Sequence, residues 1–103
     1  MALEITDSNI AEVLTEKSIT VLDFWAPWCS PCRMLGPIID ELATTNTDVT
    51  IGKVNVDENA IKAASFGIRG IPTTIFFKNG KEIDRMVGVH SKAQFQAKID
   101  SLK

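Results

Sequence analysis

Apolar residues follow two alternating periodicities along the chain, separated by turn-forming residues. Residues 2–5 can form a short strand. Ile10, Val13 and Leu14 then have the i, i+3, i+4 spacing of an amphipathic helix. Residues 19–26 are almost all apolar and partly β-branched, which is typical of a strand covered on both faces. We therefore expect residues 19–26 to form the centre of a sheet.

The next part of the chain continues this alternation. A long helix is predicted from Cys29 onward, because apolar residues form one stripe along it. The stripe consists of Leu35, Ile38, Ile39 and Leu42. Residues 49–56 predict another strand, and a short helix follows, capped by Asp57 or Asn59 and ending at Gly67.

The last third predicts a hairpin and a helix. Two strand-like segments, residues 73–77 and 82–88, flank the Asn-Gly pair at residues 79–80, a strong hairpin signal. The final helix opens with a capping box over residues 91–94. Its buried side is formed by Phe95, Ile99 and Leu102. The order β-α-β-α-β-α-β-β-α predicts an α/β fold, with a central mixed five-stranded sheet flanked by four helices.

Composition and charge exclude several classes of protein. With 103 residues, the chain is expected to form one domain, residues 1–103, with a core that needs no metal. A net charge of −2 provides no basic surface for nucleic acid or anionic lipid. No segment approaches the roughly 20 apolar residues of a membrane span, and the first residues lack a secretory signal pattern. We therefore expect a cytoplasmic monomer with no nucleic-acid or membrane partner.

Both cysteines lie in the segment Trp28-Cys29-Ser30-Pro31-Cys32, where an apolar strand gives way to the long helix. Helical side chains three residues apart have Cβ atoms about 5–6 Å apart, so a modest adjustment brings two thiols to disulfide distance. Pro31 suits a first helical turn. Cys29, at the helix start, is expected to be exposed and to have a stabilised thiolate, which makes it the attacking sulfur. Cys32 is expected to be more sheltered and to be the resolving sulfur.

Two other interpretations of the cysteine pair are weaker. A purely structural disulfide across so short a loop would contribute only about 2 kcal/mol. A zinc site needs two more ligands, and the chain has no third cysteine and a single histidine. We therefore expect no metal. A cysteine pair at this spacing in a reducing cytoplasm is more often catalytic or redox-sensing than structural.

Asp23 is a carboxylate within an apolar strand segment. Burial raises the pKa of such a group, and a carboxylate with a raised pKa can accept a proton from Cys32 as that residue resolves a mixed disulfide. The residues alone leave two alternatives open, an aspartate that reaches solvent and one permanently paired with Lys53. Lys53 itself is expected to face outward and to have no direct chemical role, acting at most as an electrostatic neighbour of Asp23.

Further segments extend the pattern around the cysteine pair over almost the whole chain. They are Asp23-Phe24-Trp25-Ala26, Lys53, Gly70-Ile71-Pro72-Thr73, Phe77-Lys78-Asn79-Gly80 and Val87-Gly88. Together with the CxxC motif, these segments resemble the thioredoxin family. CxxC alone also occurs in glutaredoxins and disulfide oxidases, whereas the whole set is specific. The resemblance implies the thioredoxin fold and a general protein disulfide reductase, an oxidoreductase active in electron transport and cell redox homeostasis.

The resemblance also implies a reaction sequence. The Cys29 thiolate attacks a substrate disulfide, and Cys32 then attacks Cys29 to release the reduced substrate. Asp23 has the role of proton acceptor. No cofactor is bound by the chain itself, because electrons come from NADPH through a flavoprotein thioredoxin reductase. The implied partners are that reductase and disulfide-containing substrate proteins.

A docking surface is implied as well. The family has a cis peptide bond beside the cysteines, which here is Ile71–Pro72, although an ordinary turn proline is the alternative. The substrate platform implied by the resemblance consists of Trp28, Ile71, Pro72, Gly88 and Val89.

The chain departs from the family between the cysteines, where Ser30-Pro31 replaces Gly-Pro. A serine hydroxyl can hydrogen-bond a thiolate, which contributes about 0.5–1.5 kcal/mol, or roughly 10–30 mV of reduction potential. We expect Ser30 to make the protein a slightly weaker reductant without reversing its direction. The alternative functions are a thiol oxidase or isomerase, which would need an export signal, and a non-catalytic binding module of the same fold.

Overall fold

The apolar segment that begins at Ile19 forms β2 (Ile19–Trp25), the middle strand of a five-stranded sheet with the order β1-β3-β2-β4-β5. The computed structural model describes residues 1–103. The other strands are β1 (Leu3–Glu4), β3 (Thr50–Asn55), β4 (Thr73–Lys78) and β5 (Lys81–Val87). β1, β3 and β2 run parallel, whereas β4 is antiparallel to both β2 and β5. The predicted mixed sheet with a doubly covered central strand is confirmed.

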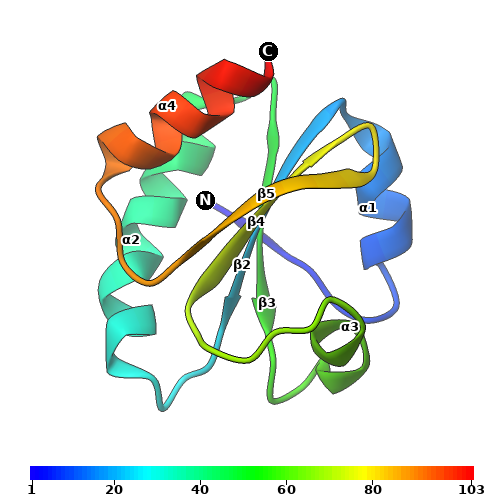
Figure 1. Ribbon diagram of the computed structural model, residues 1–103, viewed down its shortest axis with the longest axis vertical. Helices are drawn as coiled ribbons and strands as arrows, with labels where there is room; N and C mark the ends of the chain where they lie inside the picture. Colours follow the sequence, from blue (N-terminus) through cyan, green and yellow to red (C-terminus); the bar gives the residue numbers. More distant parts are fainter.

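Helices cover both faces of this sheet (Figure 1). They are α1 (Ile10–Glu16), α2 (Ser30–Thr45), α3 (Ala60–Ser65) and α4 (Lys92–Leu102). α2 and α4 pack on one face, and α1 and α3 pack on the other (Figure 1). None of the four helices is long and apolar enough to cross a membrane.

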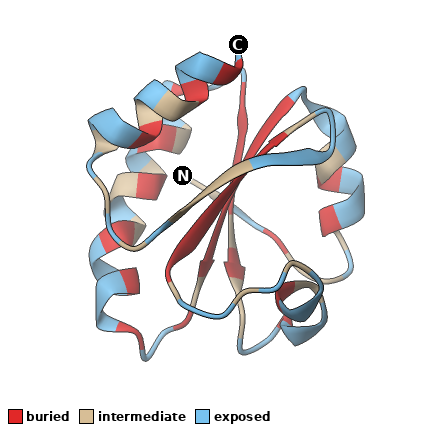
Figure 2. Ribbon diagram, viewed as in Figure 1, coloured by how far each residue is buried: buried red, intermediate tan, exposed pale blue.

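The two faces of the sheet have separate cores, and β2 contributes to both. Val21 packs beneath α2 and α4, whereas Leu22 and Phe24 belong to the core beneath α1 and α3. Figure 2 shows the buried residues concentrated on the inner strands and on the helix sides that face them. Because alternate residues of a strand point to opposite faces, a strand buried on both faces must be apolar at successive positions. Thr20 and Asp23 are the exceptions within β2, and Asp23 is the one that can carry a charge.

Two local predictions are confirmed in detail. Asn79 and Gly80 both have positive φ, 52° and 80°, as a tight hairpin turn between β4 and β5 requires. At the start of α4, Ser91 Oγ accepts a hydrogen bond from the Gln94 backbone N–H, and Gln94 Oε1 accepts one from the Ser91 N–H. This reciprocal pair is the predicted capping box.

The prediction that the side chain of Asp57 or Asn59 caps α3 is wrong. Asn59 occupies the cap position, but its side chain makes no bond to the helix and instead accepts the Asp7 backbone N–H at 2.9 Å. The Asp7 carboxylate accepts the N–H of Lys62, also at 2.9 Å. A residue distant in sequence thus satisfies the helix terminus, which no local pattern could indicate.

Candidate active site

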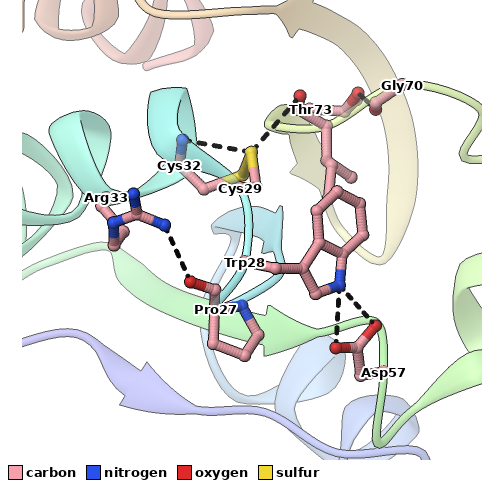
Figure 3. The surroundings of a disulfide bond; sticks show 9 residues. Pro27, Trp28, Cys29, Cys32, Arg33, Asp57, Gly70 and Thr73 are labelled. Carbon is pink, nitrogen blue, oxygen red and sulfur yellow. Dashed lines mark hydrogen bonds between the residues drawn. A yellow bond between two sulfur atoms is a disulfide. The ribbon is translucent and has the colours of Figure 1, made fainter.

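The two cysteines lie where β2 ends and α2 begins, at the carboxyl edge of the parallel strands. Cys29 is the N-cap residue of α2, and Pro31 is in the first turn. Cys29 and Cys32 form a disulfide with Cα atoms 5.2 Å apart, and the Cys32 backbone N–H donates to Cys29 Sγ at 3.3 Å (Figure 3). The predicted position of Cys29 at the helix start is confirmed. The unpaired N–H groups of α2 are therefore directed toward this sulfur.

The expectation that Cys29 is exposed is wrong for the disulfide form. Cys29 is 5% exposed and Cys32 is 2% exposed. The reason is tertiary packing, because both cysteines belong to a small cluster with Ala26 against which Ile71 also packs. Cys29 Sγ lies 3.8 Å from the carbonyl oxygen of Ile71. Access to the disulfide is therefore narrow, with Cys29 only slightly more open than Cys32.

Trp28 is the large exposed side chain beside the disulfide, with 68% of its surface accessible. Its indole Nε1–H donates to both carboxylate oxygens of Asp57, at 3.0 and 3.2 Å (Figure 3). Asp57, which the sequence suggested as a helix cap, instead holds the orientation of this ring. On the other side of the loop, the Arg33 guanidinium donates to the Pro27 carbonyl at 3.0 Å.

Two further loops meet next to the disulfide. The Ile71–Pro72 bond is cis, as the resemblance implied, with Ile71 half-buried and Pro72 buried. The Gly88 N–H donates to the Pro72 carbonyl at 2.8 Å, with Gly88 at φ +90°, a conformation that favours glycine. Val89 follows and is 40% exposed. The structure thus brings Ile71, Pro72 and Gly88 together near Cys29.

Asp23 is buried in β2 without a hydrogen bond. It is 1% exposed, and neither carboxylate oxygen has a hydrogen-bond partner. Burial disfavours the charged form and raises the pKa of Asp23 to about 7; the positive charge of Lys53 opposes this rise, and the negative charge of Asp40 adds to it. Both alternatives for Asp23, a solvent-facing carboxylate and a permanent pair with Lys53, are therefore wrong.

A cavity of about 220 Å³ lies between the buried carboxyl of Asp23 and Cys32. Its lining residues are Asp23, Trp25, Cys32, Arg33, Gly36 and Lys53. Cys32 and Asp23 therefore border one shared cavity.

Lys53 lies opposite Asp23 in the register of β3 and β2 but is paired elsewhere. Its Nζ is 3.1 Å from Asp40 Oδ1, and Asp40 also accepts the Ala2 backbone N–H. The expectation that Lys53 faces outward is wrong, because its side chain is only 23% exposed and lies toward α2. Sequence reasoning missed Asp40. The signal was its helical spacing, since Cys32, Gly36 and Asp40 are successive i, i+4 positions on one face of α2.

The remaining predicted residue is Ser30. It is exposed at the first position of α2, directly after Cys29. No group of three or more metal-ligating side chains is present in the structure.

Comparison with known proteins gives a consistent result. The Thioredoxin family model matches residues 1–101. Thioredoxin 1 of Synechococcus elongatus is 45% identical over 97% of this chain and 95% of its own length. Thioredoxin 2 of Chlorobaculum tepidum is 48% identical over 94% of this chain and 91% of its own length. The solved structure of a mutant thioredoxin from Halobacterium salinarum NRC-1 superposes with a TM-score of 0.92, at 32% identity, over 98% of this chain and 89% of that one.

The raised pKa of Asp23 predicts an unusual dependence of stability on pH. The unfolded chain loses this proton near pH 4, whereas the folded protein keeps it until about pH 7. The contribution of Asp23 to the free energy of unfolding is therefore greatest below about pH 4. It falls by roughly 4 kcal/mol in total as the pH rises to about 7. Asp23→Asn should remove this loss and be more stable than wild type above pH 7, as measured by urea unfolding of the oxidised protein.

The difference between wild type and variant isolates Asp23 from the other carboxylates. Asp100→Asn, at an exposed position of α4, is the matched control and should leave the wild-type pH dependence in place. A wild type and an Asp23→Asn variant whose unfolding free energies change in parallel from about pH 5 to about pH 9 would show that Asp23 is not protonated by burial.

The Asp40–Lys53 pair predicts a second shift. Asp40→Asn removes a negative charge and frees the Lys53 ammonium to approach Asp23, and both changes favour the carboxylate. The pKa of Asp23 should fall by about one unit, measured from the side-chain carboxyl 13C resonance. Glu41→Gln, at the next residue of α2 and paired with Lys92 instead, is the control and should have little effect. An unchanged or higher pKa of Asp23 in Asp40→Asn would contradict this arrangement.

Proposed function

The chain belongs to the thioredoxin family and is a dithiol disulfide reductase, and from this premise we propose that its substrates are disulfides in a broad range of other proteins. The observation that carries the proposal is the Cys29–Cys32 disulfide at the N-terminus of α2, next to exposed apolar side chains. The reductase cycle has two steps.

The first step is attack by Cys29. In the reduced protein, the N-terminus of α2 stabilises a thiolate at Cys29, with the backbone N–H of Cys32 the nearest donor. This thiolate attacks one sulfur of the substrate disulfide. A new disulfide joins Cys29 to the substrate, the substrate disulfide breaks, and the departing sulfur takes the electron pair and then a proton from solvent.

The second step is resolution by Cys32. Its thiol gives a proton to the Asp23 carboxylate across the cavity that they share, and the Cys32 thiolate attacks the Cys29 sulfur. The disulfide between Cys29 and Cys32 forms, the bond to the substrate breaks, and the second substrate sulfur leaves as a thiolate. The substrate has then gained two electrons, which the two cysteines have lost. A carboxyl with a pKa of about 7 is suited to this role at neutral pH.

Docking is proposed to use the apolar surface around the disulfide. Trp28 and Val89 are exposed, and the Asp57 carboxylate holds the Trp28 indole. Ile71, Pro72 and Gly88 complete the surface where two loops meet beside Cys29.

The electron source and setting follow from family membership. We propose that the chain binds no cofactor and receives electrons from NADPH through a flavoprotein thioredoxin reductase. Residues 1–103 would act as one domain and as a monomer in the cytoplasm, in electron transport and cell redox homeostasis. Its partners would be that reductase and disulfide-containing proteins, with no nucleic acid and no membrane.

The test is NADPH-coupled reduction of a disulfide protein, such as insulin, with a thioredoxin reductase. Wild type should turn over, and Cys29→Ser should not. Cys32→Ser should stop after the first step and accumulate a mixed disulfide with the substrate, visible by intact mass under non-reducing conditions. Folded wild-type protein without turnover, or a Cys29→Ser variant as active as wild type, would contradict the proposal and favour a binding module.

Ser30 is proposed to adjust the reduction potential. If its hydroxyl hydrogen-bonds the Cys29 thiolate, the reduced form is stabilised, and Ser30→Gly should lower the potential by roughly 10–30 mV. Equilibration with a redox buffer, followed by separation of the oxidised and reduced forms, measures this difference. Ser30→Ala also lacks the hydroxyl but keeps the Cβ atom, so it should shift equally. An unchanged potential in both variants would remove the role of the hydroxyl.

A further inference from the structure

The buried side-chain oxygen and nitrogen atoms that lack a hydrogen bond all belong to two residues. They are both carboxylate oxygens of Asp23 and the hydroxyl oxygen of Thr74. Asp23 is 1% exposed and Thr74 is 0% exposed. The two residues are direct partners in the antiparallel register of β2 and β4. The unpaired polar atoms of the core are therefore gathered in one cross-strand pair.

The two side chains lie on the same face of the sheet. Their neighbours two residues along each strand, Val21 and Phe76, both belong to the core beneath α2 and α4, and side chains at that spacing share a face. Directly opposite residues of antiparallel strands have Cβ atoms about 4.5–5.5 Å apart. A rotation about the Cα–Cβ bond of Thr74 can therefore carry its hydroxyl to the Asp23 carboxylate. Lys53 occupies the corresponding place on the other side, in β3.

The charged and titratable groups around Asp23 come from β3 and α2. Lys53 faces it from β3, and α2 contributes Asp40, Cys32 and Arg33. Lys53 is paired with Asp40, so neither of these residues is a hydrogen-bond partner of Asp23. β4 provides no charge opposite Asp23, but it does provide an uncharged hydroxyl.

We propose that Thr74 is a positioning residue for the resolution step, and that its hydroxyl donates a hydrogen bond to the Asp23 carboxylate whenever Asp23 is ionised. The inference rests on the proposed role of Asp23 as the base for Cys32. A hydroxyl donor favours the ionised carboxylate and orients it, which counteracts the effect of burial. Valine would fill the same volume without burying a hydroxyl, so packing alone does not account for a threonine at this position.

The test compares Thr74→Val, which keeps the shape, with Thr74→Ser, which keeps the hydroxyl. Reduced protein is mixed with Ellman's reagent in a stopped-flow instrument, where the first thionitrobenzoate released reports attack by Cys29 and the second reports resolution by Cys32. Resolution slows at low pH as Asp23 becomes protonated, and in Thr74→Val this fall in rate should occur about one pH unit higher than in wild type. At a pH below the pKa of Asp23 in both proteins, resolution in the variant should therefore be roughly tenfold slower. The rate of attack by Cys29 should be unchanged in Thr74→Val. In Thr74→Ser, the resolution rate should keep the pH dependence of wild type.

A carboxyl 13C titration gives a readout independent of activity. The pKa of Asp23 should rise by about one unit in Thr74→Val and in Thr74→Ala, which also lacks the hydroxyl, and should stay near the wild-type value in Thr74→Ser. A pKa that is unchanged or lower in Thr74→Val would overturn the proposal. An equal shift in Thr74→Ser would also overturn it, because that shift would then come from packing.

Failure of this inference can be told apart from failure of the proposed base. If Asp23→Asn slows resolution while Thr74→Val leaves its pH profile unchanged, only the role of Thr74 is lost. If Asp23→Asn leaves resolution unchanged, the base itself is wrong and the inference falls with it. In an Asp23→Asn background, the effect of Thr74→Val on resolution should disappear.

Discussion

The carboxyl of Asp23, buried without a hydrogen bond in the central strand, is the constraint on which the rest of the site depends. β2 is covered on both faces, and the Asp23 side chain, 1% exposed, borders a cavity that is also lined by Cys32. Burial favours its protonated form, and the nearest cation, that of Lys53, is already paired with Asp40. The fold thus maintains a carboxyl that can gain or lose a proton near neutral pH, at the expense of stability above that range.

The same strand also positions the sulfur chemistry. β2 ends at Trp25, and the chain enters α2 with Cys29 at the cap position, so the helix N-terminus and the buried carboxyl are fixed relative to one another by continuous backbone. Cys32 and Asp40 lie on one face of α2, two turns apart, with Gly36 between them. The Lys53 ammonium lies against this part of α2, because a Cβ atom built on Gly36 would be in ordinary contact with Nζ at 3.5 Å. One strand and one helix therefore determine the relative positions of the Cys29 sulfur, the Cys32 sulfur and the Asp23 carboxyl.

The order of elements, the central strand, the hairpin and the capping box could all be predicted, because each rests on a local pattern or a periodicity. The cysteine pair and Asp23 were also identifiable, since both are unusual residue types for their places in the pattern. Long-range side-chain contacts could not be predicted. Asp57 with Trp28, Asp40 with Lys53 and the Asp7 cap of α3 join residues that only the sheet topology brings together. The burial of the disulfide was missed for the same reason, since it comes from packing by a loop more than forty residues away in sequence.

The most direct test of this account is the pH dependence of the resolution step in wild type and in Asp23→Asn, measured with attack and resolution separated in time. The account predicts that attack by Cys29 is nearly the same in both proteins. The rate of resolution in wild type should depend on pH through a group with a pKa of about 7. In Asp23→Asn, resolution should be slower at neutral pH by on the order of a hundredfold, and its rate should no longer depend on that group. Equal resolution rates in the two proteins across the pH range would contradict it.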